Sequence, residues 1–111
     1  MNARTPDRLQ GSLSLLILKS LASRGSMHGY GITVHIHTVS GDVLRVEEGS
    51  LYPALHRLTQ DGLLRAEWRT SENNRRARYY SLTAAGKKRL AEEEQRFLEV
   101  TDAVRRVLLY V

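Results

Sequence analysis

The chain has 111 residues, enough for one small folded domain, and 41% of them are hydrophobic. It contains no cysteine, which excludes a disulfide framework, a thiol nucleophile and any cysteine-ligated metal site. No apolar run reaches the roughly 18 residues of a membrane span, and residues 1–7 lack the pattern of a secretory signal, so we expect a cytoplasmic protein that does not enter membranes. The formal net charge is +5, and most basic residues are arginine, which favours a nucleic acid or another anionic surface as partner.

The first predicted helix covers residues 9–21. Leu9, Leu13, Leu16 and Ile17 fall on one face, and further leucines extend the apolar surface nearly all round. A helix of this kind is buried on more than one side, which indicates a contact with a second subunit as well as with its own chain. Gly25 supplies a stop signal.

A second helix is predicted over residues 27–40, where Ile32, Ile36 and Val39 have helical spacing. The many β-branched residues in this segment also favour a strand. Gly41 ends the helix, and residues 43–46 are expected to form a short extended link.

The third predicted helix, residues 48–61, has a clear apolar stripe between Leu51 and Leu58. Ser50 is the expected N-cap, because its hydroxyl can accept a bond from a first-turn amide. Pro53 would then stand at the third helical position, where a missing amide costs nothing. Gly62 fits a C-terminal cap.

A β-hairpin follows the third helix. Leu64, Ala66 and Trp68 alternate with charged residues, which predicts a half-buried strand with Trp68 in the core. Residues 78–82 form the expected returning strand. Ser71–Arg76 is the expected tip, where two consecutive asparagines tolerate a left-handed turn.

One long helix is predicted from its N-cap Thr83 to Val111, a span of about 43 Å at 1.5 Å per residue. Leu90, Phe97, Val104 and Val111 recur every seven residues, which is typical of a coiled-coil seam. The helix would project beyond so small a core, so we expect the seam to be buried against another chain.

These elements predict a mainly α fold with a small β-hairpin: a winged helix-turn-helix over residues 1–82 and a C-terminal dimerisation helix over residues 83–111, together one compact unit. In a winged helix-turn-helix the third helix is the element offered to the DNA major groove.

Several motifs make the chain resemble the PadR family of bacterial transcriptional regulators. They are Met27-His28-Gly29-Tyr30, Glu48-Gly49-Ser50-Leu51-Tyr52-Pro53-Ala54-Leu55, Arg57-Leu58, Asp61-Gly62-Leu63-Leu64, Glu67-Trp68, Arg75-Arg76-Ala77-Arg78-Tyr79-Tyr80 and Leu82-Thr83-Ala84-Ala85-Gly86. The resemblance covers about residues 9–90, and the length resembles the short subfamily with a single C-terminal helix. Ser26, Gly31 and Thr59 depart from the residues common in the family.

The residues expected to bind DNA lie on the third helix and in the hairpin, here called the wing. On the helix, hydroxyl groups, first-turn amides and basic side chains suit phosphates and base edges. In the wing, arginines begin a stretch from Arg75 to Arg89 without an acidic residue. The resemblance also implies that Tyr30 contacts the DNA backbone. The alternative is that Tyr30 is a core aromatic residue whose hydroxyl has a buried partner. The expected DNA-binding residues are Tyr30, Ser50, Tyr52, His56, Arg57, Arg75, Arg76 and Arg78.

The first and last helices are expected to form a homodimer that binds a pseudo-palindromic double-stranded DNA operator, most simply as a repressor. The expected interface residues are Leu9, Leu13, Leu16, Leu90, Phe97, Thr101, Val104, Leu108 and Val111. The resemblance also implies a possible small aromatic effector, because the short subfamily includes regulators that bind flat aromatic compounds between their subunits.

An alternative from a different class is a winged-helix protein-interaction module whose arginines meet an acidic protein partner. An enzyme is not expected, because no nucleophile, paired carboxylates or phosphate-binding loop stands out. The four histidines lack metal-ligand spacing, so neither a metal nor a cofactor is expected, and His28 is expected to cap or pack in its turn.

Overall fold

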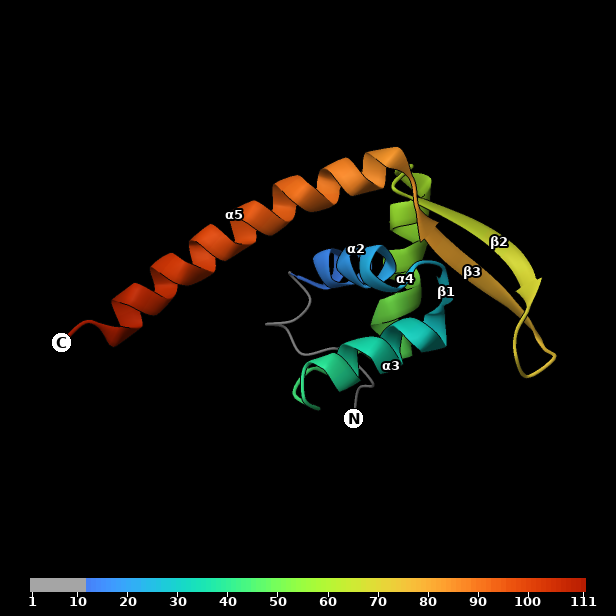
Figure 1. The fold of residues 1–111 in the computed structure, drawn as a ribbon, viewed down its shortest axis with the longest axis horizontal. Helices are drawn as coiled ribbons and strands as arrows, with labels where there is room; N and C mark the ends of the chain where they lie inside the picture. Colours follow the sequence, from blue (N-terminus) through green and yellow to red (C-terminus); the bar gives the residue numbers. More distant parts are fainter. Residues whose placement is uncertain (1–11) are drawn as a thin grey trace.

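Residues 12–111, which the computed structural model describes, fold in the expected order of three helices, a hairpin and a long helix (Figure 1). The elements are α2 (Leu13–Arg24), β1 (Met27–His28), α3 (Gly29–Val39), α4 (Glu48–Gln60), β2 (Leu64–Thr70), β3 (Arg76–Leu82) and α5 (Ala84–Leu109). Leu9, one of the expected interface residues, lies outside the described residues. None of the helices in residues 12–111 is both long and apolar enough to cross a membrane.

The core forms where α2, α3 and α4 meet the inner part of the sheet. Its fully buried side chains come from all three helices and are Ile17, Leu18, Ile32, Leu51 and Leu55. Leu63, Leu64 and Tyr80 close the core from the sheet side. The apolar stripes predicted for the first three helices therefore point inward, except at Val39, which is 71% exposed. Burial of the inward side chains is the main stabilising term.

The sheet has three strands rather than the two expected from the sequence. Its order is β1-β3-β2, all antiparallel, and Met27 lies opposite Tyr80. Residues 27 and 28 were expected to begin the second helix, but they pair with β3, and α3 starts at Gly29. A two-residue strand has no sequence signature of its own, because it becomes a strand only when β3 supplies its hydrogen-bond partners.

The start of α4 also differs from the expectation. Its N-cap is Glu47 and its first helical residue Glu48, so Ser50 is the third residue of the helix and not its cap. Pro53 consequently lies at the sixth helical position, not the third, and the carbonyl of Gly49 loses the amide bond that a non-proline residue would donate. The expectation failed because the preference for a serine cap is worth only about 1 kcal/mol, which tertiary packing can outweigh.

The turn between α4 and β2 holds the N-cap of α5, Thr83, in place. The Thr83 side chain caps α5 by accepting a 3.0 Å hydrogen bond from the Gly86 amide, as the sequence predicts. The same hydroxyl donates to the Gly62 carbonyl at 2.7 Å, and the Thr83 amide donates to the Leu63 carbonyl at 3.1 Å. These bonds set the direction in which α5 leaves the domain.

Beyond its first three turns, α5 extends away from the core toward the C-terminus (Figure 1). Lys19 on α2 and Glu94 form a 3.2 Å ion pair, and every residue from Gln95 onward is exposed. Two expected interface residues, Leu13 and Leu90, are instead 4% and 7% exposed in the chain's own core, which leaves little of their surface for a second chain. Leu16 is partly buried against the same core.

Candidate nucleic-acid interface

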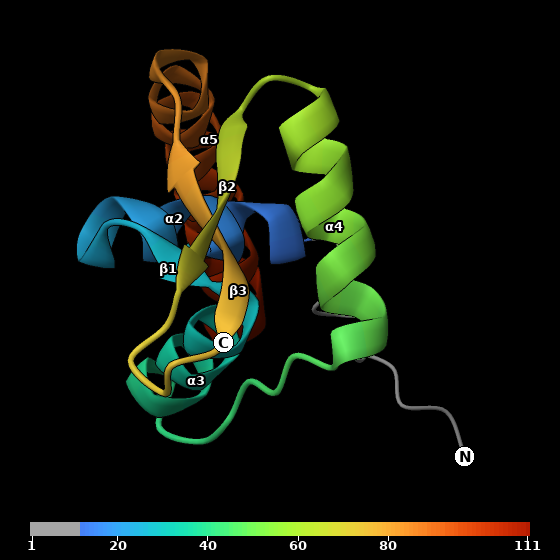
Figure 2. The same cartoon turned by 90° about the vertical axis from the view of Figure 1, so that its right-hand side faces the viewer.

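Helix α4 exposes its outer face beside the hairpin, and Figure 2 shows the hairpin in front with α4 next to it. His56 and Gln60 point away from the buried stripe and are exposed. Tyr52 and Arg57 lie about 140° apart around the helix, at roughly 100° per residue, and therefore occupy opposite flanks of this outer face. The expected α4 residues thus form a surface wider than one row of side chains.

Tyr52 lies on the flank toward α3. The residue is 45% exposed, and its hydroxyl reaches the backbone at Gly29, the first residue of α3. Burial raises the pKa of Tyr52 above the ordinary value of 10.0, with smaller contributions from Glu48 and Tyr80. The side chain therefore joins the two helices of the helix-turn-helix while leaving part of its ring accessible.

Arg57 lies on the opposite flank, toward α2. Its Nη2 donates to the Ser14 hydroxyl at 3.5 Å, a long bond between exposed groups that leaves other guanidinium donors free to turn outward. Ser50 lies about two helical turns earlier near the same flank and is partly buried.

The first turn of α3 presents Tyr30 to solvent. His28 is the N-cap of α3, and its Nδ1 accepts a 3.0 Å bond from the Gly31 amide, which confirms the expected capping role. Tyr30 is 70% exposed, so the core-aromatic alternative for this residue is wrong.

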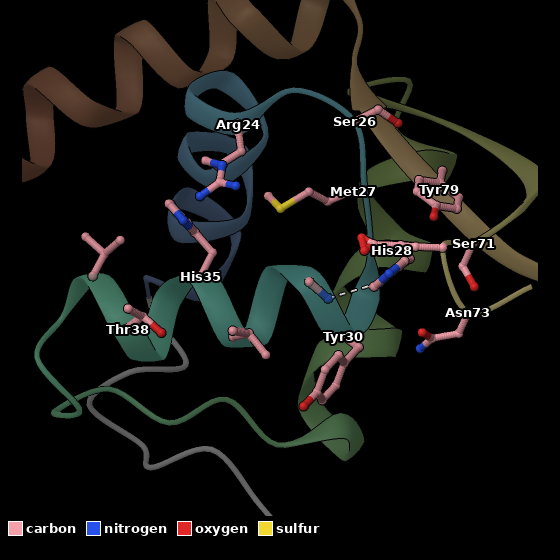
Figure 3. Close-up of a pocket in the computed structure, with 14 residues that line it drawn as sticks. Arg24, Ser26, Met27, His28, Tyr30, His35, Thr38, Ser71, Asn73 and Tyr79 are labelled. Atoms are coloured by element: carbon pink, nitrogen blue, oxygen red, sulfur yellow. Dashed lines mark hydrogen bonds between the residues drawn. The ribbon is translucent and has the colours of Figure 1, made fainter.

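An open groove of about 580 Å³ separates α3 from the loop at the wing tip (Figure 3). Tyr30 and His28 line its α3 side, and Ser71 and Asn73 line its wing side, while Arg24 lies at the end of α2 (Figure 3). The structure therefore brings the expected α3 tyrosine close to the wing, although the two are some 40 positions apart in the sequence.

The wing carries the expected arginines beyond the edge of the core. Its tip is closed by a 2.6 Å bond from the Ser71 amide to the Arg75 carbonyl, and Asn74 has the left-handed φ of 61° expected for the turn. Arg75, Arg76 and Arg78 are exposed. In residues 12–111, none of the three forms an ion pair with a carboxylate.

Trp68 lies outside the core, and the expectation that it is a core residue is wrong. It is 56% exposed, because β2 continues past the helices that cover its inner end. The guanidinium carbons of Arg76 and Arg78 lie 5.2 and 5.7 Å from the centre of its ring. The alternation of apolar and charged residues identifies the face of the strand but does not show where the core beneath it ends.

The other charged groups are less suited to an anion. Arg69 is bonded to Glu67 at 2.6 Å, and Arg89 pairs with Glu93 at 3.7 Å. Across the described part of the chain, no group of three or more His, Asp or Glu side chains could hold a metal ion. Within residues 12–111, Arg75, Arg76 and Arg78 therefore form a cluster of cations in the wing that no carboxylate compensates.

Three helices, a short strand and a two-stranded wing define a winged helix-turn-helix, a class of fold in which one helix and the wing face DNA. The model of the transcriptional regulator PadR-like family matches residues 17–92, and the chain therefore belongs to this family. The resemblance indicated by the motifs is confirmed.

The relatives agree with this assignment. The chain is 37% identical over 83 residues to the transcriptional regulator Rv3488 of Mycobacterium tuberculosis, covering 75% of this chain and 74% of the relative. A PadR-like transcriptional regulator from Bacillus cereus has a TM-score of 0.81 at 25% identity, with 96% and 100% of the two chains covered. A PadR family transcriptional regulator from Eggerthella lenta has a TM-score of 0.77 at 28% identity, with 94% and 88% covered.

Proposed function

We propose that this transcriptional regulator acts in the cytoplasm as a homodimeric repressor that binds a pseudo-palindromic DNA operator. Each α4 would enter a major groove, with His56 and Arg57 near base edges and Ser50 and Tyr52 near phosphates. Tyr30 and the wing arginines would contact the flanking backbone. The observation that carries the proposal is the set of exposed wing arginines that have no carboxylate partner within residues 12–111, on a wing adjacent to the exposed face of α4.

The homodimer is supported by the distal half of α5. Phe97, Val104 and Leu108 are 45%, 50% and 77% exposed, and they lie in the part of α5 from Gln95 onward, where every described residue is exposed. Exposed apolar stretches of this length mark interaction sites. Two-fold pairing through α5 would place half-sites about one DNA turn apart, or a multiple of it.

A small aromatic effector that releases the DNA completes the proposal. Its support is the family resemblance together with two exposed aromatic side chains, Phe97 on α5 and Tyr110 at the C-cap of α5. Flat aromatic compounds titrated into the protein–DNA complex should release the DNA in a saturable manner, whereas an unchanged complex would remove the effector from the proposal.

Band-shift assays with DNA flanking the gene for this chain test the repressor proposal. Binding to a preferred pseudo-palindromic site should persist in an excess of unrelated competitor DNA. Binding that ignores sequence would exclude a specific operator. Failure to bind any DNA would favour the alternative of a protein-interaction module.

A further inference from the structure

Trp68, the one tryptophan of the chain, lies on the wing beyond the edge of the core. In the register of the hairpin it lies opposite Arg78, and Thr70 lies opposite Arg76. Residues directly opposite each other share a face, as do residues two apart on one strand. Trp68, Arg76 and Arg78 therefore project from one face of the wing, the continuation of the face that buries Leu64 and Tyr80.

Both arginines lie over the indole ring. Their guanidinium carbons are 5.2 and 5.7 Å from its centre, inside the distance of about 6 Å at which a cation is attracted to an aromatic face. Two like charges two residues apart on a strand repel each other, and no described carboxylate compensates them. Both cations instead share the Trp68 ring as a neighbour.

The opposite face of the wing carries a contrasting arrangement. The guanidinium of Arg69 lies 4.7 Å from the centre of the Tyr79 ring, but this cation is neutralised by Glu67 at 2.6 Å. It also donates to the Ser26 hydroxyl at 2.8 Å, which ties the wing to the segment before β1. On the Tyr79 face of the wing, the arginine that contacts the aromatic ring is thus paired with a carboxylate. On the Trp68 face, the two arginines that contact the ring have no described carboxylate partner.

We propose that Trp68 is a positioning residue that holds Arg76 and Arg78 side by side to bind DNA phosphates, so that the Trp68 face of the wing is the one that meets DNA. The inference rests on the proposed DNA-binding function. A guanidinium stacked on a ring keeps its in-plane N–H donors available for a phosphate. Holding the two side chains before binding also reduces the conformational entropy that is given up when the complex forms.

Binding measured over a range of salt concentrations tests the role of Trp68. Trp68→Leu should weaken DNA binding about five- to tenfold and lower the slope of log affinity against log salt by about 1 to 2, because one or two phosphates are no longer neutralised. Trp68→Phe should restore part of the DNA affinity and part of the salt slope, because phenylalanine still offers an aromatic ring. Arg69→Ala, which removes the satisfied cation of the other face, is the matched control and should leave the slope unchanged.

A double-mutant comparison separates positioning from a general structural role. In a chain that already carries Arg76→Ala and Arg78→Ala, Trp68→Leu should have no further effect on affinity, because nothing remains to position. An effect that persists in this background overturns the proposal. An unchanged affinity and salt slope for Trp68→Leu in the otherwise native chain overturns it too.

The wild-type protein provides a readout that needs no variant, since all tryptophan fluorescence comes from Trp68. Operator DNA should protect this fluorescence from quenching by acrylamide. Equal quenching with and without bound DNA would show that the Trp68 face points away from DNA, which overturns the inference while the DNA-binding function stands. A wild-type protein that binds no DNA would instead refute the proposed function itself.

Discussion

The Tyr52 hydroxyl of α4 occupies the space beside Gly29 at the start of α3, so closely that a Cβ on residue 29 would lie 2.7 Å from it. The two residues come from the two motifs, His28-Gly29-Tyr30 and Ser50-Leu51-Tyr52, that identify the helix-turn-helix in the sequence. Their contact explains why a residue without a side chain stands at the first position of α3.

Gly29→Ala should therefore displace Tyr52 and destabilise the domain by about 1 kcal/mol, as expected for modest overpacking. Urea unfolding measures the effect. Gly31→Ala in the same helix is the matched control, because its Cβ would meet the His28 ring at an ordinary 3.5 Å. That control should be neutral or stabilising by up to about 1 kcal/mol, since alanine favours a helix. Equal behaviour of the two variants would contradict the contact.

The raised pKa of Tyr52 predicts a loss of stability at alkaline pH. Because the pKa in the folded chain exceeds the unfolded value of 10.0, the contribution is fully present below about pH 10 and is lost as the pH rises through the higher folded value. Tyr52→Phe should reduce the loss of unfolding free energy above about pH 10. Tyr110→Phe, at a side chain 86% exposed, should not. Parallel pH profiles for Tyr52→Phe and the wild type would refute the assignment.

Gly86→Ala should be more harmful than Gly29→Ala. A Cβ on Gly86 would overlap the backbone carbonyl oxygen of Leu63, which cannot swing aside as a side chain can because it accepts the Thr83 amide bond. We expect a loss of about 3 kcal/mol, at the upper end of overpacking effects. Denaturant unfolding beside the Gly31→Ala control measures it, and a wild-type midpoint for Gly86→Ala would contradict the close approach of α5 to the α4–β2 turn.

The wing arginines predict a change in salt dependence. Arg75→Ala with Arg76→Ala should weaken binding to all DNA sequences alike and lower the salt slope by about 0.9 for each phosphate that the variant no longer neutralises. Arg65→Ala removes an exposed arginine at the base of β2 and serves as the control. A slope that the double variant shares with the wild type would argue against the wing as a phosphate-binding element.

The exposed seam of α5 predicts the oligomeric state. We expect a dimer in sedimentation at micromolar concentration, and Val104→Asp should weaken it at least about 100-fold by burying an unpaired charge. Gln95→Asp adds the same charge about 180° away around the helix and should leave the dimer intact. A wild-type monomer, or equal sensitivity to both variants, would remove the seam from the interface.

Periodicity predicts that the helices exist and which faces are buried, and it predicts most of the core, but it does not show where α3 and α4 begin. The stripe from Leu51 to Leu58 is buried as predicted, and Thr83 caps α5 through its own hydroxyl. These features depend on residues within two turns of one another, so local spacing contains the information. The same holds for Asn74, whose left-handed backbone follows from its side chain and its place in a tight turn.

Local sequence patterns also predict part of the candidate DNA-binding surface. The arginines of the wing and the outer face of α4 follow from charge clustering and helical spacing. The contact between Tyr52 and Gly29, and the neighbourhood of Tyr30 and the wing tip, join residues from separate elements. No local pattern specifies them, because they depend on how α3, α4 and the hairpin pack.

The sequence by itself determined the family, the order of the elements, the apolar faces of the helices and the basic character of the wing, since each depends on residue type and short-range spacing. Only the tertiary structure decided that residues 27 and 28 form a strand, that α4 begins at Glu48, and that Trp68 stands outside the core beside two arginines. The physical reason is the same in each case: these outcomes depend on which distant segment supplies a hydrogen-bond partner or covers a side chain.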